Sequence, residues 1–178
     1  MQALRFIGQI YWLLLPIILG GVANMVFVKL PVLKAWRVPM DGGKTLRDGK
    51  RLFGDNKTWK GFVGMTVLTS LFAALLWSWS LGIVRAVLLG AGLGLAYVLF
   101  ELPNSFVKRR LGRNAGTNGG IVQTFFDQAD SVIGCTWLLF AIAQITWQEA
   151  LVFFALGVFT HYVINVLLYL VKLKNQRG

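Results

Sequence analysis

The chain has 178 residues, of which 56% are hydrophobic and 14% are charged, and its mean hydropathy is +0.64. Soluble domains carry about 25% charged residues, so the composition excludes an ordinary soluble domain, and it is too apolar for a disordered chain. A surplus of 18 Lys+Arg over 7 Asp+Glu gives a net charge of +11, which is typical of proteins with phosphate-bearing partners.

Long uncharged runs predict five transmembrane helices. The runs cover residues 6–28, 61–84, 86–100, 131–148 and 150–171. The first, second and fifth reach the ~20 apolar residues that cross a bilayer. The third needs its neighbours through Phe106, and the fourth follows two carboxylates. We therefore predict an all-α membrane protein in which residues 1–178 form a single transmembrane domain.

The charges predict the orientation of these helices. With five spans, three basic segments share one side: residues 32–60, residues 108–113, and the tail with Lys172, Lys174 and Arg177. The other side receives only Arg5 and Arg85. The positive-inside rule then places the N-terminus outside and the C-terminus in the cytoplasm. We expect a multi-pass protein of the cell membrane with its active site facing the cytoplasm.

Six of the seven carboxylates fall on this predicted cytoplasmic face, and only Glu149 lies outside. A lipid anchor needs basic residues alone. Acids set among bases at a membrane boundary suit the binding of a divalent metal together with phosphate. The acids therefore indicate more than attachment to the membrane surface.

The first cytoplasmic loop, residues 48–61, combines glycines with acids and bases. Its glycines could bring backbone amides close to phosphate, its bases could hold oxyanions, and Asp48 or Asp55 could orient a base or a metal. The Gly-Lys-Ser/Thr spacing of a Walker A loop is absent. A simple basic linker is the alternative interpretation.

Polar residues also share one face at the end of the third predicted helix. Glu101, Ser105 and Lys108 have the spacing i, i+4, i+7, and Arg109 and Arg110 follow. A carboxylate here can hold Mg²⁺, while Lys and Arg neutralise triphosphate oxygens. The alternative is a stop-transfer cluster whose long side chains reach the lipid headgroups.

Asp127 and Asp130 precede the fourth apolar run. Residues three apart on a helix face the same way, and two carboxylates at the start of a span repel each other and need a cation. N-capping of the helix by Asp127 would explain one of the two acids but not both.

Two predicted spans carry isolated polar groups. Asn24 lies in the first, and His161, Asn165 and Tyr169 recur every four residues in the last. Hydrogen bonding between helices and the lining of a headgroup cavity explain this stripe equally well.

At these residues the sequence resembles the membrane-embedded CTP:lipid-phosphate cytidylyltransferases, most closely the CDP-archaeol synthase branch. The resemblance extends over nearly the whole chain, whereas the larger phosphatidate cytidylyltransferases are similar only to its second half. In this chain Phe100-Glu101 stands where the family pattern has Gly-Asp. The matching features are Pro16, Ala23-Asn24-Met25, the 48–61 block, Ser105-x-x-Lys108-Arg109-Arg110, Asp127-Gln128-x-Asp130 and the His161/Asn165/Tyr169 stripe.

The resemblance implies attack of a lipid phosphate oxygen on the α-phosphorus of CTP, which yields a CDP-lipid and pyrophosphate for phospholipid biosynthesis. It implies Mg²⁺ held by Asp127, Asp130 and Glu101, with Asp127, Asp130 and Lys108 as catalytic residues. CTP and a membrane lipid phosphate would be the partners, and no nucleic acid is expected. The implied substrate-binding residues are Asp48, Lys50, Arg51, Asp55, Asn56, Lys57, Lys60, Ser105, Arg109, Arg110, His161, Asn165 and Asn24.

Other functions stay open at this point. A phosphatidate cytidylyltransferase would use an ester lipid in place of the ether lipid 2,3-bis-O-geranylgeranylglycerol 1-phosphate. A small transporter would use polar groups inside the membrane, such as Asn24 and His161, although transport usually needs ionisable groups near the midplane. A CDP-alcohol phosphotransferase would need an Asp-Gly-x-x-Ala-Arg motif, which Asp48-Gly49-Lys50-Arg51 only partly matches.

Overall fold

The protein is an all-α bundle in a computed structural model that describes residues 1–114 and 120–173. A short 3-10 helix, η1 (Lys34–Trp36), follows the first long helix. In the described part of the chain, extended structure is limited to two isolated bridges, Pro39 with Thr58 and Thr45 with Arg51. The five long helices are α1 (Gln2–Lys29), α2 (Trp59–Leu81), α3 (Ile83–Arg110), α4 (Gly120–Ala141) and α5 (Trp147–Leu170).

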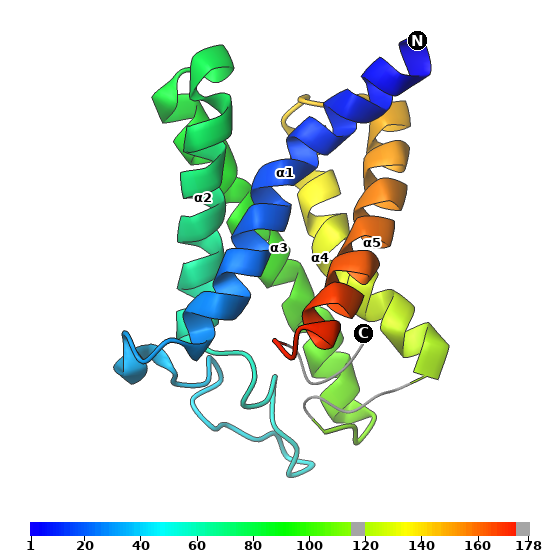
Figure 1. The fold of residues 1–178 in the computed structure, drawn as a ribbon. Helices are drawn as coiled ribbons and strands as arrows, with labels where there is room; N and C mark the ends of the chain where they lie inside the picture. The colour runs from blue at the N-terminus through cyan, green and yellow to red at the C-terminus, as the bar shows by residue number, and fades with distance from the viewer. Residues whose placement is uncertain (115–119, 174–178) are drawn as a thin grey trace.

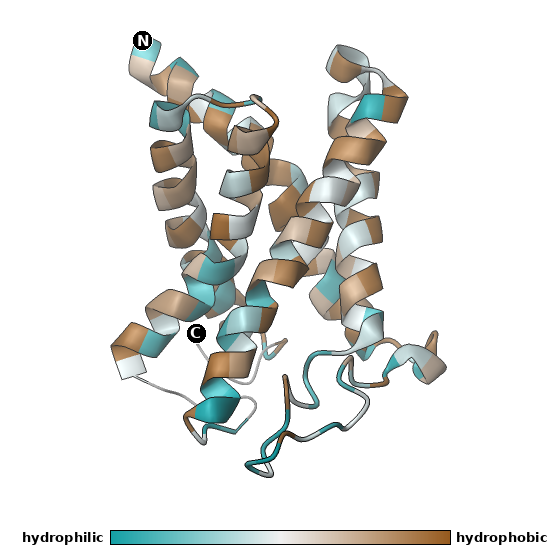
Figure 2. Ribbon diagram, turned by 180° about the vertical axis from the view of Figure 1, so that it is seen from behind, coloured by the Kyte–Doolittle hydropathy of each residue, from teal (hydrophilic) through white to brown (hydrophobic). Residues whose placement is uncertain are grey.

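The connections divide between the two ends of the bundle (Figure 1). The start of α1, the α2–α3 turn and the α4–α5 connection lie at one end, while the 30–58 connection and the ends of α3 and α5 lie at the other. Figure 2 shows hydrophilic residues gathered most densely at the second end. Two of the tail cations used to predict the orientation, Lys174 and Arg177, lie outside the described residues.

Four described helices, α1, α2, α3 and α5, are long and apolar enough to cross a membrane, and α4 falls short of that criterion. The reason lies in its polar first half, which contains Asp127 and Asp130. The structure thus has five long helices, as predicted. Four of them are apolar enough in sequence to cross a membrane, and α4 is not.

Helix α4 begins well before the predicted run at residue 131, because residues 120–130 are helical too. Asp127 and Asp130 therefore lie inside the helix, and the interpretation of Asp127 as its N-cap is wrong. Two other helix starts do carry caps: the Thr58 hydroxyl accepts from Gly61 N at 3.2 Å, and Thr146 forms a capping box with Glu149. Glu149, the one acid at the far end, thus has a structural role.

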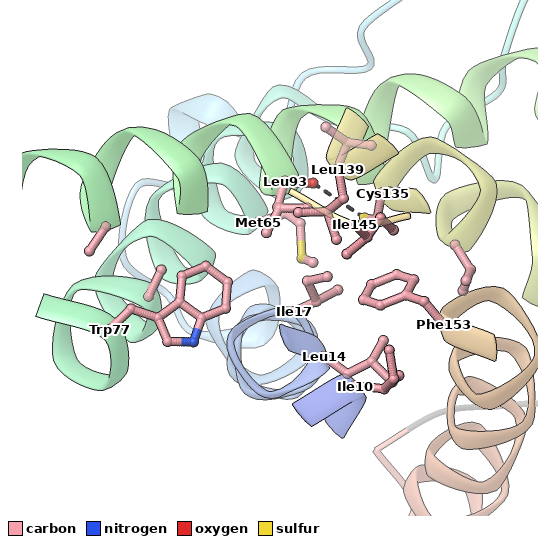
Figure 3. Close-up of a cluster of buried hydrophobic side chains, with 14 residues drawn as sticks. Ile10, Leu14, Ile17, Met65, Trp77, Leu93, Cys135, Leu139, Ile145 and Phe153 are labelled. Carbon is pink, nitrogen blue, oxygen red and sulfur yellow. Dashed lines mark hydrogen bonds between the residues drawn. The ribbon is translucent and has the colours of Figure 1, made fainter. Parts of the chain in front are cut away.

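Small residues let α1, α2 and α3 approach closely. A Cβ added at Gly20 of α1 would lie 2.9 Å from the Thr69 Cα, and one at Gly94 of α3 would lie 2.6 Å from the Thr66 Cα. Lipid chains are as apolar as the side chains, so helices in a membrane associate through close backbone contacts of this kind. Larger apolar side chains from all five helices complete the core (Figure 3), and Cys135 is packed there with its Sγ 3.5 Å from the Leu93 carbonyl oxygen.

Candidate functional site

A cavity of about 710 Å³ lies among the helices and reaches the polar end of the bundle. It follows α1 from Leu14 to Val28 and α5 from Gly157 to Leu168, so much of its wall is apolar. Near the polar end its lining includes Glu101 and Lys108 of α3. The cavity thus joins a hydrocarbon-like interior to a cluster of charges.

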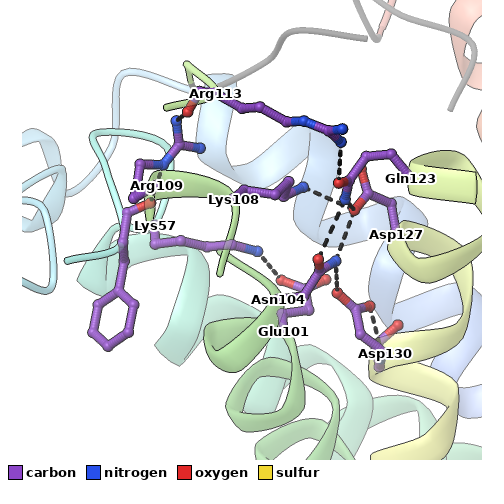
Figure 4. Close-up of polar contacts among 11 residues, drawn as sticks. Lys57, Glu101, Asn104, Lys108, Arg109, Arg113, Gln123, Asp127 and Asp130 are labelled. Carbon is purple, nitrogen blue, oxygen red and sulfur yellow. Dashed lines mark hydrogen bonds and ion pairs between the residues drawn. The ribbon is translucent and has the colours of Figure 1, made fainter. Parts of the chain in front are cut away.

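That cluster is the α3–α4 polar cluster, which consists of Glu101, Asn104, Lys108, Gln123, Asp127 and Asp130 (Figure 4). Asp127 Oδ1 accepts hydrogen bonds from Asn104 Nδ2 at 2.7 Å, Lys108 Nζ at 2.8 Å and Gln123 Nε2 at 2.7 Å. Asn104 Nδ2 also donates to Asp130 Oδ2 at 2.7 Å. One lysine and two amides therefore compensate the two neighbouring carboxylates of α4.

Glu101 is compensated by a different segment. Its carboxylate pairs with the Lys57 ammonium, which reaches α3 from the loop before α2. Lys57 engages Glu101, and Asn104 lies beside the two aspartates. Across residues 1–114 and 120–173 no three Asp, Glu, His or Cys side chains form a metal-binding group. The three-carboxylate metal site stays a prediction.

Asp41 organises the loop that covers this end of the bundle. Its buried carboxylate accepts from Arg51 Nη2 at 2.5 Å and from the amides of Gly43, Phe53 and Gly54 at 3.0–3.1 Å. Burial acts to raise the pKa of Asp41, but these hydrogen bonds outweigh it and hold the pKa well below its ordinary value. Sequence reasoning missed Asp41, although an acid before Gly42-Gly43 is a usable turn signal.

The same loop is fastened to the end of α3. The Arg110 guanidinium pairs with Asp48 at 2.5 Å and donates to the Lys50 carbonyl at 3.0 Å, while Lys50 Nζ donates to the Arg110 carbonyl at 2.8 Å. Arg109 Nε donates to the Phe53 carbonyl at 3.2 Å. We name Asp41, Asp48, Lys50, Arg51, Arg109 and Arg110 the loop clasp.

The loop clasp contains several predicted binding residues that lie outside the cavity lining. Arg51 pairs with Asp41 and with Asp55, at 2.7 Å from the latter. The clasp groups bind one another, the backbone and Asp55, and the lining of the cavity does not include them. Five of the six were predicted as substrate contacts, and those roles stay predictions, because composition cannot separate a base that holds a loop from a base that holds a ligand. The predicted site residues of the clasp that lie outside the cavity lining are Asp48, Lys50, Arg51, Arg109 and Arg110.

Lys60 is also outside the cavity, and it is fully buried. Its Nζ donates to the carbonyls of Leu30 at 2.8 Å and Val32 at 2.7 Å, where α1 has just ended, and it lies 4.7 Å from the centre of the Phe27 ring. A cation at a helix C-terminus satisfies otherwise unpaired carbonyls. Lys60 therefore caps α1 in this structure, and its predicted substrate contact stays a prediction.

The polar stripe of α5 both pairs helices and lines the cavity. His161 Nδ1 lies 3.1 Å from the Gln128 carbonyl oxygen, which only accepts, so Nδ1 carries a proton, and His161 Nε2 lies 3.0 Å from the Tyr97 hydroxyl. Asn165 Nδ2 donates to Gln128 Oε1. His161 and Asn165 thus form hydrogen bonds between helices and also line the cavity, whereas Tyr169 is not part of its lining; that the cavity holds a headgroup stays a prediction.

The structure brings all of the other predicted site residues together around the cavity. Sequence reasoning missed Arg37 and Tyr97 in its lining, as well as Asn104 and Gln123 beside it. Asn104 carried a usable signal, because it lies on the helical face between Glu101 and Lys108. The predicted residues that line the cavity are Asn24, Asp55, Asn56, Lys57, Glu101, Ser105, Lys108, Asp127, Asp130, His161 and Asn165.

Comparisons with known proteins show which family the chain belongs to. A sequence model of the CarS-like family of CDP-archaeol synthases matches residues 3–177. The CDP-archaeol synthase of Pyrococcus furiosus is 29% identical over 170 residues, which cover 94% of this chain and 95% of that protein. The enzyme of Saccharolobus solfataricus is 34% identical over 145 residues, which cover 77% of this chain and 80% of that protein.

A solved structure of an intramembrane enzyme for archaeal membrane lipid biosynthesis has the same fold. It superposes with a TM-score of 0.66 at 28% sequence identity, and the match covers 87% of this chain and 91% of that chain. Family model, relatives and structure all extend over most of the molecule. The chain belongs to the CarS-like family of CDP-archaeol synthases.

Proposed function

We propose that the protein transfers a cytidylyl group from CTP to a lipid phosphate and makes a CDP-lipid of the CDP-archaeol type. A lipid phosphate oxygen forms a bond to the α-phosphorus, the bond from that phosphorus to the bridging oxygen breaks, and pyrophosphate leaves. The observation that carries the proposal is the cavity that joins an apolar interior to the α3–α4 polar cluster. Membership of the family supports the same reaction.

Two cavity cations are placed to receive phosphate. Lys57 and Lys108 come from separate segments and are each about one-fifth exposed, with side-chain accessibilities of 20%. Each is paired with a carboxylate, which keeps the ammonium in place before the substrates arrive. Phosphoryl transfer depends mainly on positioning and on electrostatic stabilisation, so the reaction needs no nucleophilic side chain.

We further propose Mg²⁺ as the cofactor, held by Asp127 and Asp130. Both carboxylates lie 2.7 Å from one atom, Asn104 Nδ2, so their oxygens converge, and carboxylate oxygens are the ligands that Mg²⁺ prefers. When bound, the ion would neutralise charge on the triphosphate and on the leaving pyrophosphate. Lys108, which already contacts Asp127, would hold the triphosphate beside it.

The apolar wall of the cavity is proposed to take the first part of the lipid chains. Leu14, Ile17 and Ile18 of α1 line this part of it. The ether lipid phosphate 2,3-bis-O-geranylgeranylglycerol 1-phosphate is the proposed substrate, in keeping with the family. His161 and Asn165 would then lie at the level of the headgroup, between the chains and the charges.

We propose that residues 1–178 form one domain, that all five long helices cross the cell membrane and that the site faces the cytoplasm. The positions of the ends support five crossings, since α1 begins at one end of the bundle and α5 ends at the other (Figure 1). The Lys108 ammonium, which compensates Asp127, also makes α4 less polar than its sequence. Basic residues at the end with the 30–58 connection support the orientation.

The test uses the purified full chain with CTP, Mg²⁺ and an equal mixture of ether lipid phosphate and phosphatidate. Pyrophosphate release together with a CDP-ether lipid in the mass spectrum is the expected result. A CDP-ester product alone would replace the proposed substrate, and no release with either lipid would overturn the proposed reaction. Transport by proteoliposomes that survives Asp127→Ala and Asp130→Ala would instead favour a transporter.

A further inference from the structure

Asn104 occupies the centre of the α3–α4 polar cluster (Figure 4). Its Nδ2 donates to Asp127 Oδ1 and to Asp130 Oδ2, each at 2.7 Å. Both aspartates line the cavity, whereas Asn104 is not part of its lining. The amide therefore contacts the two carboxylates without itself facing the space where substrates would bind.

The surrounding hydrogen bonds fix which way the Asn104 amide points. Its Oδ1 accepts from Gln123 Nε2 at 3.3 Å, and the same Nε2 donates to Asp127 Oδ1 at 2.7 Å. The opposite orientation would set the amide oxygen against two carboxylate oxygens and the amide nitrogen against another NH₂ group. Amide orientations are assigned from such networks, and this one has a single consistent solution.

Other donors to these carboxylates each serve one of them. Lys108 and Gln123 donate to Asp127, and the Ser131 backbone amide donates to Asp130 at 2.6 Å. Among the residues that the structure describes, Asn104 is the side chain that donates to both. Two carboxylates on one helical face repel each other, so a shared donor is what keeps them together.

We propose that Asn104 is a positioning residue that holds Asp127 and Asp130 in the arrangement that binds a divalent cation. The inference rests on the proposed function for the presence of that cation. A neutral NH₂ group satisfies one oxygen on each acid, adds no charge, and leaves the remaining lone pairs for the ion. Hydrogen-bond partners of metal-binding carboxylates commonly change metal affinity about 10–100-fold when they are removed.

Mn²⁺ binding to the full-length protein, measured by electron paramagnetic resonance without CTP or lipid, tests this role. Asn104→Leu removes both hydrogen bonds at nearly constant volume, and we expect the affinity to fall by about 10–100-fold. Asn104→Ser keeps one donor and should give an intermediate affinity. Asn104→Asp keeps the shape but replaces the donor with a third carboxylate, and it should bind Mn²⁺ more weakly than the serine variant.

The aspartate variant separates positioning from direct ligation. An Asn104→Asp protein that binds Mn²⁺ as tightly as wild type or more tightly would overturn the proposal, because a ligand tolerates that change and a donor does not. If Asn104→Leu fails to fold in a thermal unfolding assay, the other two variants still test the proposal, which requires Asn104→Ser to bind Mn²⁺ more tightly than Asn104→Asp. The control is Ser70→Ala, which removes a hydrogen bond between α2 and the Val87 carbonyl of α3, outside the cavity lining, and should leave the Mn²⁺ affinity unchanged.

The measurement stands apart from the cytidylyltransferase assay. If the Mn²⁺ affinity depends on Asn104 as expected but wild-type protein makes no CDP-lipid, the proposed function is overturned and this inference stands. If wild-type protein makes CDP-lipid but the Asn104→Leu variant binds Mn²⁺ as tightly as wild type, the proposed function stands and this inference is overturned.

Discussion

The α3–α4 polar cluster and the loop clasp are built from the same residue types, yet they have different surroundings. The pairs of the cluster and its Lys57 partner lie in the cavity wall, with side-chain exposures of 20–24%. The pairs of the clasp lie over the end of the bundle and differ in exposure. The Asp41 carboxylate is buried, that of Asp48 is 42% exposed, and Arg51 also pairs with the Asp55 carboxylate, which is 80% exposed. Exposed pairs are screened by water and contribute little energy individually.

The comparison shows that an acid–base pair acquires its role from what it faces. In the cluster, each cation and carboxylate also faces an internal space that could hold a charged ligand. In the clasp, Arg110 and Arg109 donate to backbone carbonyls, so their charge is used to hold the loop. Matched substitutions in the two regions should therefore have different effects.

The largest effect is expected for Asp127→Asn. It removes a carboxylate that accepts three hydrogen bonds and leaves Lys108 without its partner. We expect kcat/KM for CDP-lipid formation to fall by about 10²–10³-fold, as when an electrostatic group of an active site is lost. Asp48→Asn makes the same change in the clasp and should cost less than about tenfold. Equal losses in both variants would remove the distinction between the regions.

Lys57→Met should have the next largest effect. The change leaves Glu101 unpaired in the cavity wall, and we expect roughly a 10²-fold loss of activity with little change in the unfolding temperature. Lys60→Met is the matched change three residues later, at a lysine that caps α1. It should lower the unfolding temperature and affect activity less. Activity lost at Lys60 with unchanged stability would place Lys60 in contact with a substrate.

Asp41→Asn should have an intermediate effect that is confined to the loop. The amides of Gly43, Phe53 and Gly54 donate to Asp41, so they should exchange hydrogen about tenfold faster in the variant. Because the folded pKa of Asp41 lies below its ordinary value near 4, its stabilisation is complete above that pH and is lost as the pH falls further. Protection of these amides should decline in acid in the wild type but not in the variant.

The smallest effect is expected for Arg51→Lys. The guanidinium of Arg51 bridges Asp41 and Asp55, and lysine cannot reproduce that two-sided contact. The charge remains and the pair is partly exposed, so we expect only about a two- to fivefold loss of activity. A loss as large as that of Lys57→Met would mean that Arg51 leaves the clasp to bind a substrate.

Much of the fold could be predicted from the sequence because apolar runs and charged boundaries are local signals. The starts of α2 and α3 and the extent of α5 follow from them within a few residues. The early start of α4 could not be predicted, since its first half pairs polar residues with α3. A helix whose carboxylates are compensated by a neighbouring helix looks in isolation like a loop that leads into a helix.

The candidate site was predictable in part for a similar reason. The spacing of Glu101, Ser105 and Lys108 placed them on one helical face, and all three line the cavity. The contacts of Lys60 and Arg110 were not predictable. A lysine that caps α1 and an arginine that holds a loop are the same residue types as the lysines and arginines that bind phosphate. Contacts between segments far apart in the chain separate these roles, and no local pattern records them.

The sequence by itself determined that this is an apolar helical protein whose acids and bases gather near one end, because hydropathy and charge are properties of each residue. Only the tertiary structure decided which charges face the cavity. It placed Lys57 against Glu101 and Asn104 between Asp127 and Asp130, and it turned Arg51 and Lys60 away. The physical reason is that a charged side chain takes the nearest available partner, and packing of the helices and the loop determines which partner that is.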